Sequence, residues 1–324
     1  MDLINKSDKV FVAGASGMVG SAVVRKLKQE DFKNILAPKR EEVDLEDYEE
    51  VKNWFELNKP DVVVFCAAKV GGIMANSTKP AEFILQNLKI QNNVIENSFK
   101  NGTKRFLFLG SSCIYPKNAK KPIKEEYLLS GNLEETNEWY AIAKIAGIKL
   151  CEALRKQHNF DAISLMPTNL YGPGDNYHPQ ESHVMASLIS KFCISKKKDS
   201  KYVECWGTGK PLREFLHVDD LGDAAVFCLE NWDPNSRSAP RDDMGLALNH
   251  LNVGTGKDIT IKELANKISL LTDFKGDIVW DQTKPDGTPK KQLDITKITN
   301  LGWKPKIDID SGIKNTIKNY LNNL

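Results

Sequence analysis

Short apolar runs alternate with longer amphipathic segments through the first half of this 324-residue chain. The run at 61–66, Asp-Val-Val-Val-Phe-Cys, shows no polar alternation, which is typical of a parallel strand covered by helices on both faces. Strands alternating with helices predict an α/β fold built on a doubly wound parallel sheet. The expected strands are 9–13, 34–37, 61–66, 105–109 and 161–166, and the expected helices are 18–30, 46–58, 80–99 and 139–158.

The alternation breaks after Pro173, where Gly, Pro, Asn and His become frequent and predict a loop that leaves the sheet. Thr260 and Glu263 have the spacing of a capping box and predict the start of a helix. We therefore expect a larger domain, a long surface loop and a smaller, mostly C-terminal α/β lobe. The expected larger domain is 1–175 with 213–250, the smaller lobe is 176–212 with 251–324, and the loop is 231–249; a helix is expected over 218–230 and a strand over 251–254.

The charge balance is close to neutral, with 45 Lys and Arg against 43 Asp and Glu. This excludes a generic polyanion binder, so we expect no nucleic-acid partner. The longest apolar stretch, 62–68, is far shorter than the roughly 20 residues of a membrane span, and the start lacks a signal-peptide pattern. The six cysteines are scattered without a CxxC pair. We expect a cytoplasmic protein with free thiols and no bound metal or membrane.

A glycine-rich turn follows the first predicted strand and opens the first helix. Small residues there permit a tight turn, close approach of a pyrophosphate and packing of the helix on the strand, while the helix N-terminus offers free N–H groups. A plain structural turn is the alternative, since such turns are common. At the first strand–helix junction, however, the pattern favours a Rossmann-type dinucleotide site. The turn consists of Gly14, Ala15, Ser16, Gly17, Met18, Val19 and Gly20.

Two cations at the end of the second strand favour NADP(H) over NAD(H). Arg40 presents a fork of donors that suits a 2′-phosphate, and Lys39 adds a point charge. Both could instead be ordinary surface charges. Asp44 and Leu45, just beyond, are better placed for the adenine ring.

Tyr140 and Lys144 lie four residues apart on a predicted helix and therefore on one face. At about 6 Å and an effective dielectric constant near 20, a tyrosinate and an ammonium attract by roughly 2.8 kcal/mol. That equals about two pKa units, enough to bring a tyrosine from about 10 toward 8. Such a phenol exchanges protons with a carbonyl or alcohol near neutral pH. The spacing alone occurs by chance in many helices, but together with the glycine loop it becomes a specific signal.

The glycine loop, Ser111 and the Tyr140/Lys144 pair resemble the active-site pattern of the extended short-chain dehydrogenase/reductase family. Longer blocks narrow the resemblance to members that convert GDP-4-keto-6-deoxy-D-mannose to GDP-L-fucose. Those members epimerise C3 and C5 and then reduce C4 with NADPH. The blocks run from near the N-terminus to about Trp303 and include 69–72, 109–116, 140–149, 166–172, 213–220 and 284–289.

The resemblance implies a role for each reacting side chain. Cys113 and His183 form the acid/base pair that moves protons at C3 and C5 through enolates. Ser111 and Tyr140 face the C4 oxygen, which Tyr140 protonates during reduction, and Lys144 also binds the nicotinamide ribose. Without the resemblance, Cys113 would be expected to be a small buried hydrophobe, and His183 a surface residue. The resemblance further implies that a series of residues lines the bound cofactor. These are Ala67, Ala68, Lys69, Leu109, Gly110, Ser111, Ser112, Pro167, Thr168, Asn169, Leu170 and His183.

The resemblance also implies a GDP-sugar pocket, in which Arg213 binds phosphate and Trp206 shapes the sugar or nucleotide end. Bacterial members often carry Arg at the positions of Ser16 and Lys191, so here the cofactor phosphate is expected to rest on Lys39 and Arg40. Lys at 191 also weakens bidentate pyrophosphate binding. The implied pocket comprises Ser111, Ser112, Cys113, Tyr140, Asn169, Lys191, Trp206, Arg213 and Asp286.

The resemblance implies a homodimer formed through the helix that carries Tyr140 and its neighbour. Ile142, Ile145, Ile148 and Leu150 are compatible with such an interface, and equally with a core.

Three other functions use the same fold. A nucleotide-sugar 4-epimerase or dehydratase would share the loop and the Tyr/Lys pair. A dehydratase, however, would carry Thr-Asp/Glu-Glu in place of Ser111-Ser112-Cys113, and a 4-epimerase has no use for Cys113 and His183. A non-catalytic NADP-sensing protein would be expected to lose Tyr140 or Lys144.

Overall fold

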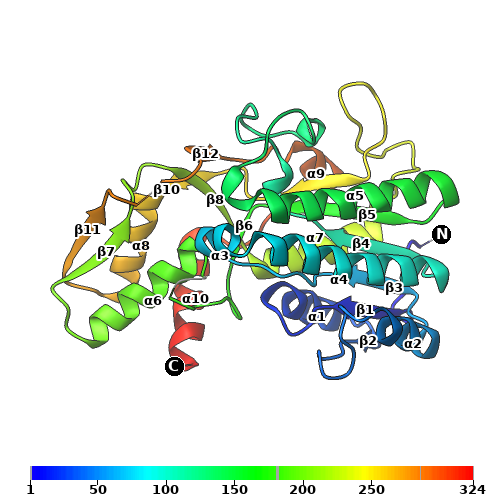
Figure 1. Cartoon of the computed structure of the whole chain (residues 1–324), viewed down its shortest axis with the longest axis horizontal. Helices are drawn as coiled ribbons and strands as arrows, with labels where there is room; N and C mark the ends of the chain where they lie inside the picture. The colour runs from blue at the N-terminus through cyan, green and yellow to red at the C-terminus, as the bar shows by residue number, and fades with distance from the viewer. Residues whose placement is uncertain (1, 180–181, 285, 324) are drawn as a thin grey trace.

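The computed structural model describes residues 2–179, 182–284 and 286–323. Its larger part is a six-stranded sheet in which every neighbouring pair is parallel (Figure 1). The strand order reverses direction around β1, as in a doubly wound sheet. The strands are, in spatial order, β2 (Asn34–Leu36), β1 (Lys9–Ala13), β3 (Val62–Phe65), β4 (Arg105–Leu109), β5 (Ala162–Pro167) and β9 (His250–Val253).

Successive residues of each central strand pack into two different cores. In β1, Val10 and Val12 join one core while Phe11 and Ala13 join the other. Both faces are therefore buried, which explains why these strands are apolar without alternation. One face is covered by α1 (Met18–Gln29), α7 (Val218–Asn231) and α9 (Thr296–Leu301), and the other by α2 (Tyr48–Asn58), α4 (Pro80–Lys100) and α5 (Glu138–His158).

The second lobe has its own apolar core, formed by three helices and several short strands (Figure 1). Strand β8 (Leu212–His217) is its centre, because β6, β10 and β12 all pair with it. The capping box at Thr260 and Glu263 is present and opens α8, as the sequence predicted. The remaining elements are β6 (Asn169–Tyr171), β7 (Tyr202–Trp206), β10 (Asp258–Thr260), β11 (Asp277–Asp281), β12 (Lys290–Lys291), α6 (Val184–Lys197), α8 (Ile261–Thr272) and α10 (Ile309–Asn322).

Three segments lie across the expected domain boundaries. Strand β9 completes the six-stranded sheet, and α9 with Trp303 packs into the first core, although residues beyond 250 were assigned to the smaller lobe. Conversely, β8 belongs to the small sheet although it begins at 212. An apolar run predicts a strand but not the sheet that it joins. We retain two domains as a proposal, with these three segments exchanged.

Short elements also lie among the helices and strands that precede β5. These are α3 (Ile73–Thr78) and 3-10 turns at Ser112–Ile114, Glu125–Tyr127 and Glu135–Asn137. The expected surface loop is present, since no helix or strand lies within 232–249, all of which the structure describes. No helix among the described residues is long and apolar enough to cross a membrane.

Candidate active site

The predicted site residues gather at the carboxyl ends of the parallel strands. The loops after β1, β2, β3, β4 and β5 carry, in turn, the glycines, Lys39 and Arg40, Ala67 to Lys69, Gly110 to Cys113, and Thr168 to Leu170. Carboxyl ends of parallel strands share one edge of the sheet, which is where ligands bind in open α/β folds.

The junction of β1 and α1 has no room for a side chain at Gly14, in the loop, or at Gly20, in the first turn of α1. Gly14 has φ +81°, and a Cβ there would lie 2.8 Å from the Ala67 Cα. A Cβ on Gly20 would overlap the Gly14 carbonyl oxygen. Gly17 caps α1 without a side-chain hydrogen bond, and no acidic residue occupies the first turn. The first N–H groups of α1 thus offer a cradle that fits a pyrophosphate.

Arg40 lies at the end of β2 with its guanidinium beside two carboxylates. Its Nη2 donates to Asp44 at 3.2 Å and to Glu46 at 3.1 Å. Hydrogen bonding and the charge of Asp44 raise the pKa of Arg40. Lys39 and Arg40 are both exposed. The two cations can meet a phosphate from solvent, although at Arg40 that phosphate competes with Asp44 and Glu46.

A buried asparagine fixes the loop after β3. The Asn87 amide accepts from the Lys69 N–H at 3.0 Å and donates to the Lys69 carbonyl at 3.0 Å. Asn87 is only 2% exposed, so α4 holds this backbone rigidly against the sheet. The Lys69 side chain turns outward to Glu82, with a distance of 2.5 Å.

Tyr140 and Lys144 share one face of α5, as predicted, and lie next to the residues after β4. Lys144 is 2% exposed, its Nζ donates to the Leu109 carbonyl at 2.9 Å, and it lies 5.9 Å from the Tyr140 ring centroid. The Tyr140 hydroxyl is hydrogen-bonded to Ser111. Ser111 in turn accepts from the Cys113 N–H at 3.3 Å. The structure therefore brings together Ser111, Cys113, Tyr140 and Lys144.

The expected lowering of the Tyr140 pKa is not found. Burial, followed by the nearby Cys113, raises the pKa of Tyr140. Lys144 does not offset this because its ammonium is directed to the Leu109 carbonyl, and burial lowers its own pKa to about 8. Helical spacing predicted the right pair but not where the cation points.

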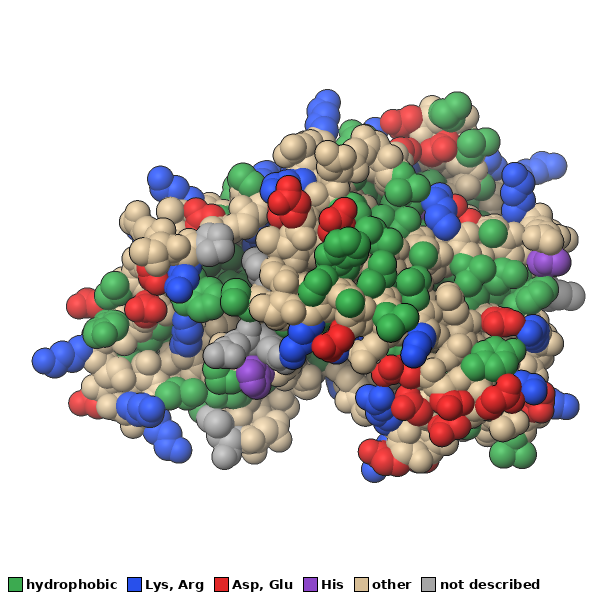
Figure 2. All heavy atoms as spheres, viewed as in Figure 1, with side chains coloured by type: hydrophobic (Ala, Val, Ile, Leu, Met, Phe, Trp, Pro, Cys, Tyr) green, Lys and Arg blue, Asp and Glu red, His purple; other side chains and the backbone are tan. Residues whose placement is uncertain are grey.

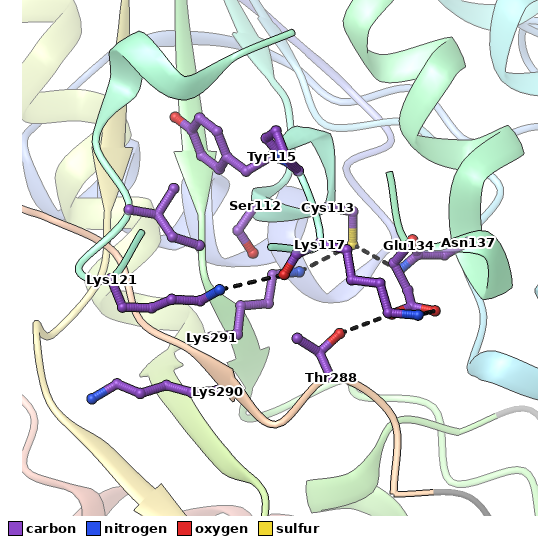
Figure 3. Close-up of a pocket in the computed structure, with 12 residues that line it drawn as sticks. Ser112, Cys113, Tyr115, Lys117, Lys121, Glu134, Asn137, Thr288, Lys290 and Lys291 are labelled. Carbon is purple, nitrogen blue, oxygen red and sulfur yellow. Dashed lines mark hydrogen bonds and ion pairs between the residues drawn. The ribbon is translucent and has the colours of Figure 1, made fainter. Parts of the chain in front are cut away.

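Cys113 borders a cavity between the 3-10 turn at 112–114 and the segment 288–291 (Figure 3). Its sulfur accepts from Asn137 Nδ2 at 3.3 Å and from Lys291 Nζ at 3.5 Å. Ser112 is buried beside it. The cysteine is half-buried, and hence open to a reactant.

His183 is the residue that caps α6. His183 is exposed at the surface, but nearby protein atoms still desolvate its ring, and this desolvation, followed by the positive charge of Lys291, lowers the pKa of His183. Lys291 therefore lies within electrostatic reach of both His183 and Cys113. Cys113 follows β4 of the larger sheet, and His183 precedes α6 of the second lobe. Each lobe therefore supplies one proton-exchanging group.

The predicted GDP-binding residues lie in the second lobe. Lys191 Nζ is 5.5 Å and Lys284 Nζ is 5.6 Å from the Trp206 ring, which is 48% exposed. Burial lowers the pKa of Arg213, while Asp286 and Glu134 offset part of this effect. Both oxygens of Asp286 accept from Thr208, each at 2.7 Å, so Asp286 also holds a turn. An exposed indole beside cations is suited to a nucleotide.

Sequence reasoning missed three residues that organise this region. Lys291 and Asn137 hold Cys113, and Glu214 connects the lobes. The buried Glu214 carboxylate accepts from the N–H groups of Thr255, Gly256 and Leu293 at 2.6–2.8 Å. Its carbonyl accepts from Asn169 at 2.8 Å and Thr168 at 3.3 Å. Only a glutamate placed directly before the apolar Phe215 and Leu216 could have signalled such a role.

The described residues contain no group of three or more His, Cys, Asp or Glu side chains that could hold a metal ion. The candidate site is thus one of proton-exchanging side chains beside a nucleotide cradle.

The chain is similar to a known protein family, to named proteins and to a solved structure. Residues 10–240 match the model of the NAD dependent epimerase/dehydratase family. GDP-L-fucose synthase 1 of Arabidopsis thaliana is 51% identical over 99% of this chain and 95% of its own, and the GDP-L-fucose synthase of Escherichia coli K12 is 47% identical over 97% of each. A solved GDP-mannoheptose C4 reductase from Campylobacter jejuni, with NADP bound, has a TM-score of 0.88 and 37% identity, covering 98% of this chain and 99% of its own.

Proposed function

The chain belongs to the NAD dependent epimerase/dehydratase family, and we propose that it converts GDP-4-keto-6-deoxy-D-mannose to GDP-L-fucose with NADPH. Near-full-length similarity to GDP-L-fucose synthases supports this substrate. The observation that carries the proposal is the pair of extra proton-exchanging groups, Cys113 and His183, that share Lys291. A simple 4-epimerase or dehydratase does not require them.

NADP(H) is the cofactor that the residues fit. The glycine cradle before α1 receives the pyrophosphate, and Lys39 with Arg40 receives the 2′-phosphate. Lys144 lies beside Tyr140, where it binds the nicotinamide ribose. When bound, NADPH supplies the hydride for C4.

Epimerisation needs one group that removes a proton and another that returns one to the opposite face. The C4 ketone makes the protons at C3 and C5 acidic, and each enolate needs donors near its oxygen. Cys113 and His183 exchange the protons, and the hydroxyls of Ser111 and Tyr140 hold the oxyanion. Their arrangement supports this assignment, because Cys113 lies next to Ser111 while His183 caps a helix of the other lobe.

Reduction uses the same oxygen. Tyr140 donates its proton to the C4 oxygen, and its raised pKa favours the protonated form that this step requires. Ser111, already hydrogen-bonded to Tyr140, positions the oxygen.

The GDP moiety is assigned to the second lobe. Arg213 and Lys191 bind phosphate oxygens, Trp206 packs against the nucleotide or sugar, and Asp286 orients the adjacent turn. Lys191 Nζ donates to the Glu204 carbonyl at 2.9 Å, which leaves two of its donors for phosphate.

A homodimer is proposed through α4 and α5, over which Figure 2 shows hydrophobic side chains gathered. Leu85 of α4 is 54% exposed and Trp139 of α5 is 43% exposed. Ile145 and Ile148 are buried in the core and do not belong to this face. The six cysteines are free, which supports a cytoplasmic location. Light scattering tests the dimer, which would have twice the 36.4 kDa mass of one chain.

The purified protein should oxidise NADPH when GDP-4-keto-6-deoxy-D-mannose is added and release GDP-L-fucose. Cys113→Ser should slow epimerisation on the order of 10²-fold, the usual worth of one acid/base group. NADH, tested alongside, should be used less efficiently. Unchanged NADPH, or a product that keeps the manno configuration at C3 and C5, would show that another member activity, or NADP sensing alone, is correct.

A further inference from the structure

Lys291 stands out among the charged residues around Cys113. Four residues that line the cavity are lysines, and three have other partners. Lys117 pairs with Glu134 at 3.2 Å, and Lys290 pairs with Asp258 at 3.1 Å. Lys121 donates to the Lys117 carbonyl at 3.3 Å. For Lys291, no carboxylate among the described residues lies within ion-pair distance, and the contact of its ammonium is the Cys113 sulfur.

The backbone explains this division between two adjacent lysines. Lys290 and Lys291 form β12, which pairs in parallel with β8. Successive side chains of a strand point to opposite faces, so Lys290 turns to Asp258. Lys291 turns instead to Cys113 (Figure 3). Two residues further on, the Leu293 N–H is held by the buried Glu214 carboxylate at 2.8 Å. The position of Lys291 is thus fixed by the sheet on one side and by Glu214 on the other.

Cys113 receives a second donor from the opposite direction. Asn137, which immediately precedes α5, donates through Nδ2 to the same sulfur at 3.3 Å. A thiol sulfur is a weak acceptor, whereas a thiolate is a strong one. Two donors on one sulfur, one of them a cation without a carboxylate partner, favour the anionic form.

The other charged groups near Cys113 do not cancel this effect. Glu134 is neutralised by Lys117 and also accepts from Thr288 at 3.0 Å. Tyr140, on α5, is kept protonated by burial. His183, which caps α6, faces the same cation, and desolvation of its ring followed by that charge lowers its pKa. Lys121 also has no carboxylate partner among the described residues, but its ammonium is directed to the Lys117 carbonyl. Lys291 is therefore the cation in contact with the sulfur.

We propose that Lys291 is a positioning residue that, together with Asn137, holds Cys113 as a thiolate ready to accept a proton from the sugar ring. The role in proton transfer rests on the proposed function, but the thiolate itself can be measured without substrate. Lys291 touches neither reacting carbon in this assignment; it acts on Cys113 through its contact with the sulfur, and its charge adds to the desolvation that lowers the pKa of His183.

Alkylation of Cys113 by iodoacetamide, followed by mass spectrometry of the full chain from pH 5.5 to 9.5, tests the proposal. The thiolate displaces iodide, forming the C–S bond as the C–I bond breaks, so the rate reports the thiolate fraction. Lys291→Met should lower the rate at pH 7 by about tenfold, and the pH profile should shift upward by about one unit. Lys290→Met is the matched control and should keep the wild-type profile, while Lys291→Arg should restore it by retaining the charge.

Superimposable profiles of wild type and Lys291→Met would overturn the proposal, as would an equal shift in Lys290→Met. Failure of Lys291→Arg to restore the profile would also contradict it. Because no GDP-sugar is present, a shifted profile together with absent turnover would refute the proposed function alone. An unshifted profile together with normal turnover would refute only the role of Lys291.

Discussion

Burial of the Lys144 ammonium costs free energy that its contacts offset only in part. It is 2% exposed, and its Nζ lies 5.5 Å and 5.0 Å from the rings of Phe65 and Phe108. Its hydrogen bond goes to a carbonyl, and no carboxylate among the described residues lies within ion-pair distance. Burial lowers the pKa of Lys144 to about 8. A charged lysine retained in such a place is typical of a functional site.

This pKa makes stability depend on pH. The folded-state pKa lies below the 10.5 of an ordinary lysine, so the unfolded chain binds more protons and stability rises with pH across that window. Between pH 7 and 9.5, the unfolding free energy of the wild type should gain about 2 kcal/mol relative to Lys144→Met. Urea unfolding at the two pH values measures this difference.

The exposed lysine on the same helix serves as the control. Lys149 pairs with Glu152 at 2.6 Å, and Lys149→Met should follow the wild-type pH dependence. If Lys144→Met shows the same pH dependence as the wild type, Lys144 is not the buried titrating group described here.

At the junction of β1 and α1, one glycine is required by packing, whereas another has room for a side chain. Gly20 is packed against the Gly14 carbonyl and lies where a Cβ would be 2.7 Å from the Ala15 Cα, whereas the nearest atom to a Cβ on Gly17 is 3.5 Å away. Both glycines belong to the same predicted cofactor cradle. Their substitution by alanine should therefore have different consequences.

Gly20→Ala should lose about 1–3 kcal/mol of unfolding free energy through overpacking. Gly17→Ala should lose less than about 1 kcal/mol, because it changes only the helix cap. Binding of NADPH should weaken in both. Urea unfolding and fluorescence titration with NADPH measure the two effects, and equal destabilisation would contradict the packing described for the loop.

The strands β1, β3, β4 and β5 of the larger sheet could be predicted from the sequence because each is an apolar run of four to six residues. β2 and β9 are not such runs, since β2 has three residues and β9 contains His250 and Asn252. The strand at 105–109 was predicted to the residue, and the helix ending at His158 to within one residue. The second lobe could not be predicted in this way, since β6 and β12 contain only three and two residues. Runs that short carry no periodicity.

The residues of the candidate site also differ in whether the sequence could predict them. Residues in recognisable motifs, such as Tyr140 and Lys144, were predicted as a pair, and the structure brings them together. Lys291 lies on the two-residue strand and Asn137 ends a three-residue 3-10 turn, so their contact with Cys113 depends on tertiary packing between distant parts of the chain. Their proximity becomes visible only in the folded protein.

The two lobes meet at the site through a few shared residues. Glu214 on β8 binds the segments at 255–256 and 293, while its carbonyl holds Thr168 and Asn169 at the end of β5. These contacts make the site residues at the strand ends of the larger sheet face the cations of the smaller lobe. This division agrees with a reaction in which one lobe binds the cofactor and the other binds the GDP-sugar.

The proposed reaction is tested most directly in heavy water. With GDP-4-keto-6-deoxy-D-mannose and NADPH in D₂O, the product should be GDP-L-fucose that carries solvent deuterium at both C3 and C5 and protium at C4. One NADPH should be oxidised for each sugar, as NMR and absorbance measure together, with a sample lacking protein as the control. A reduced product without deuterium at C3 and C5, or deuterium exchange without NADPH oxidation, would contradict the proposed function.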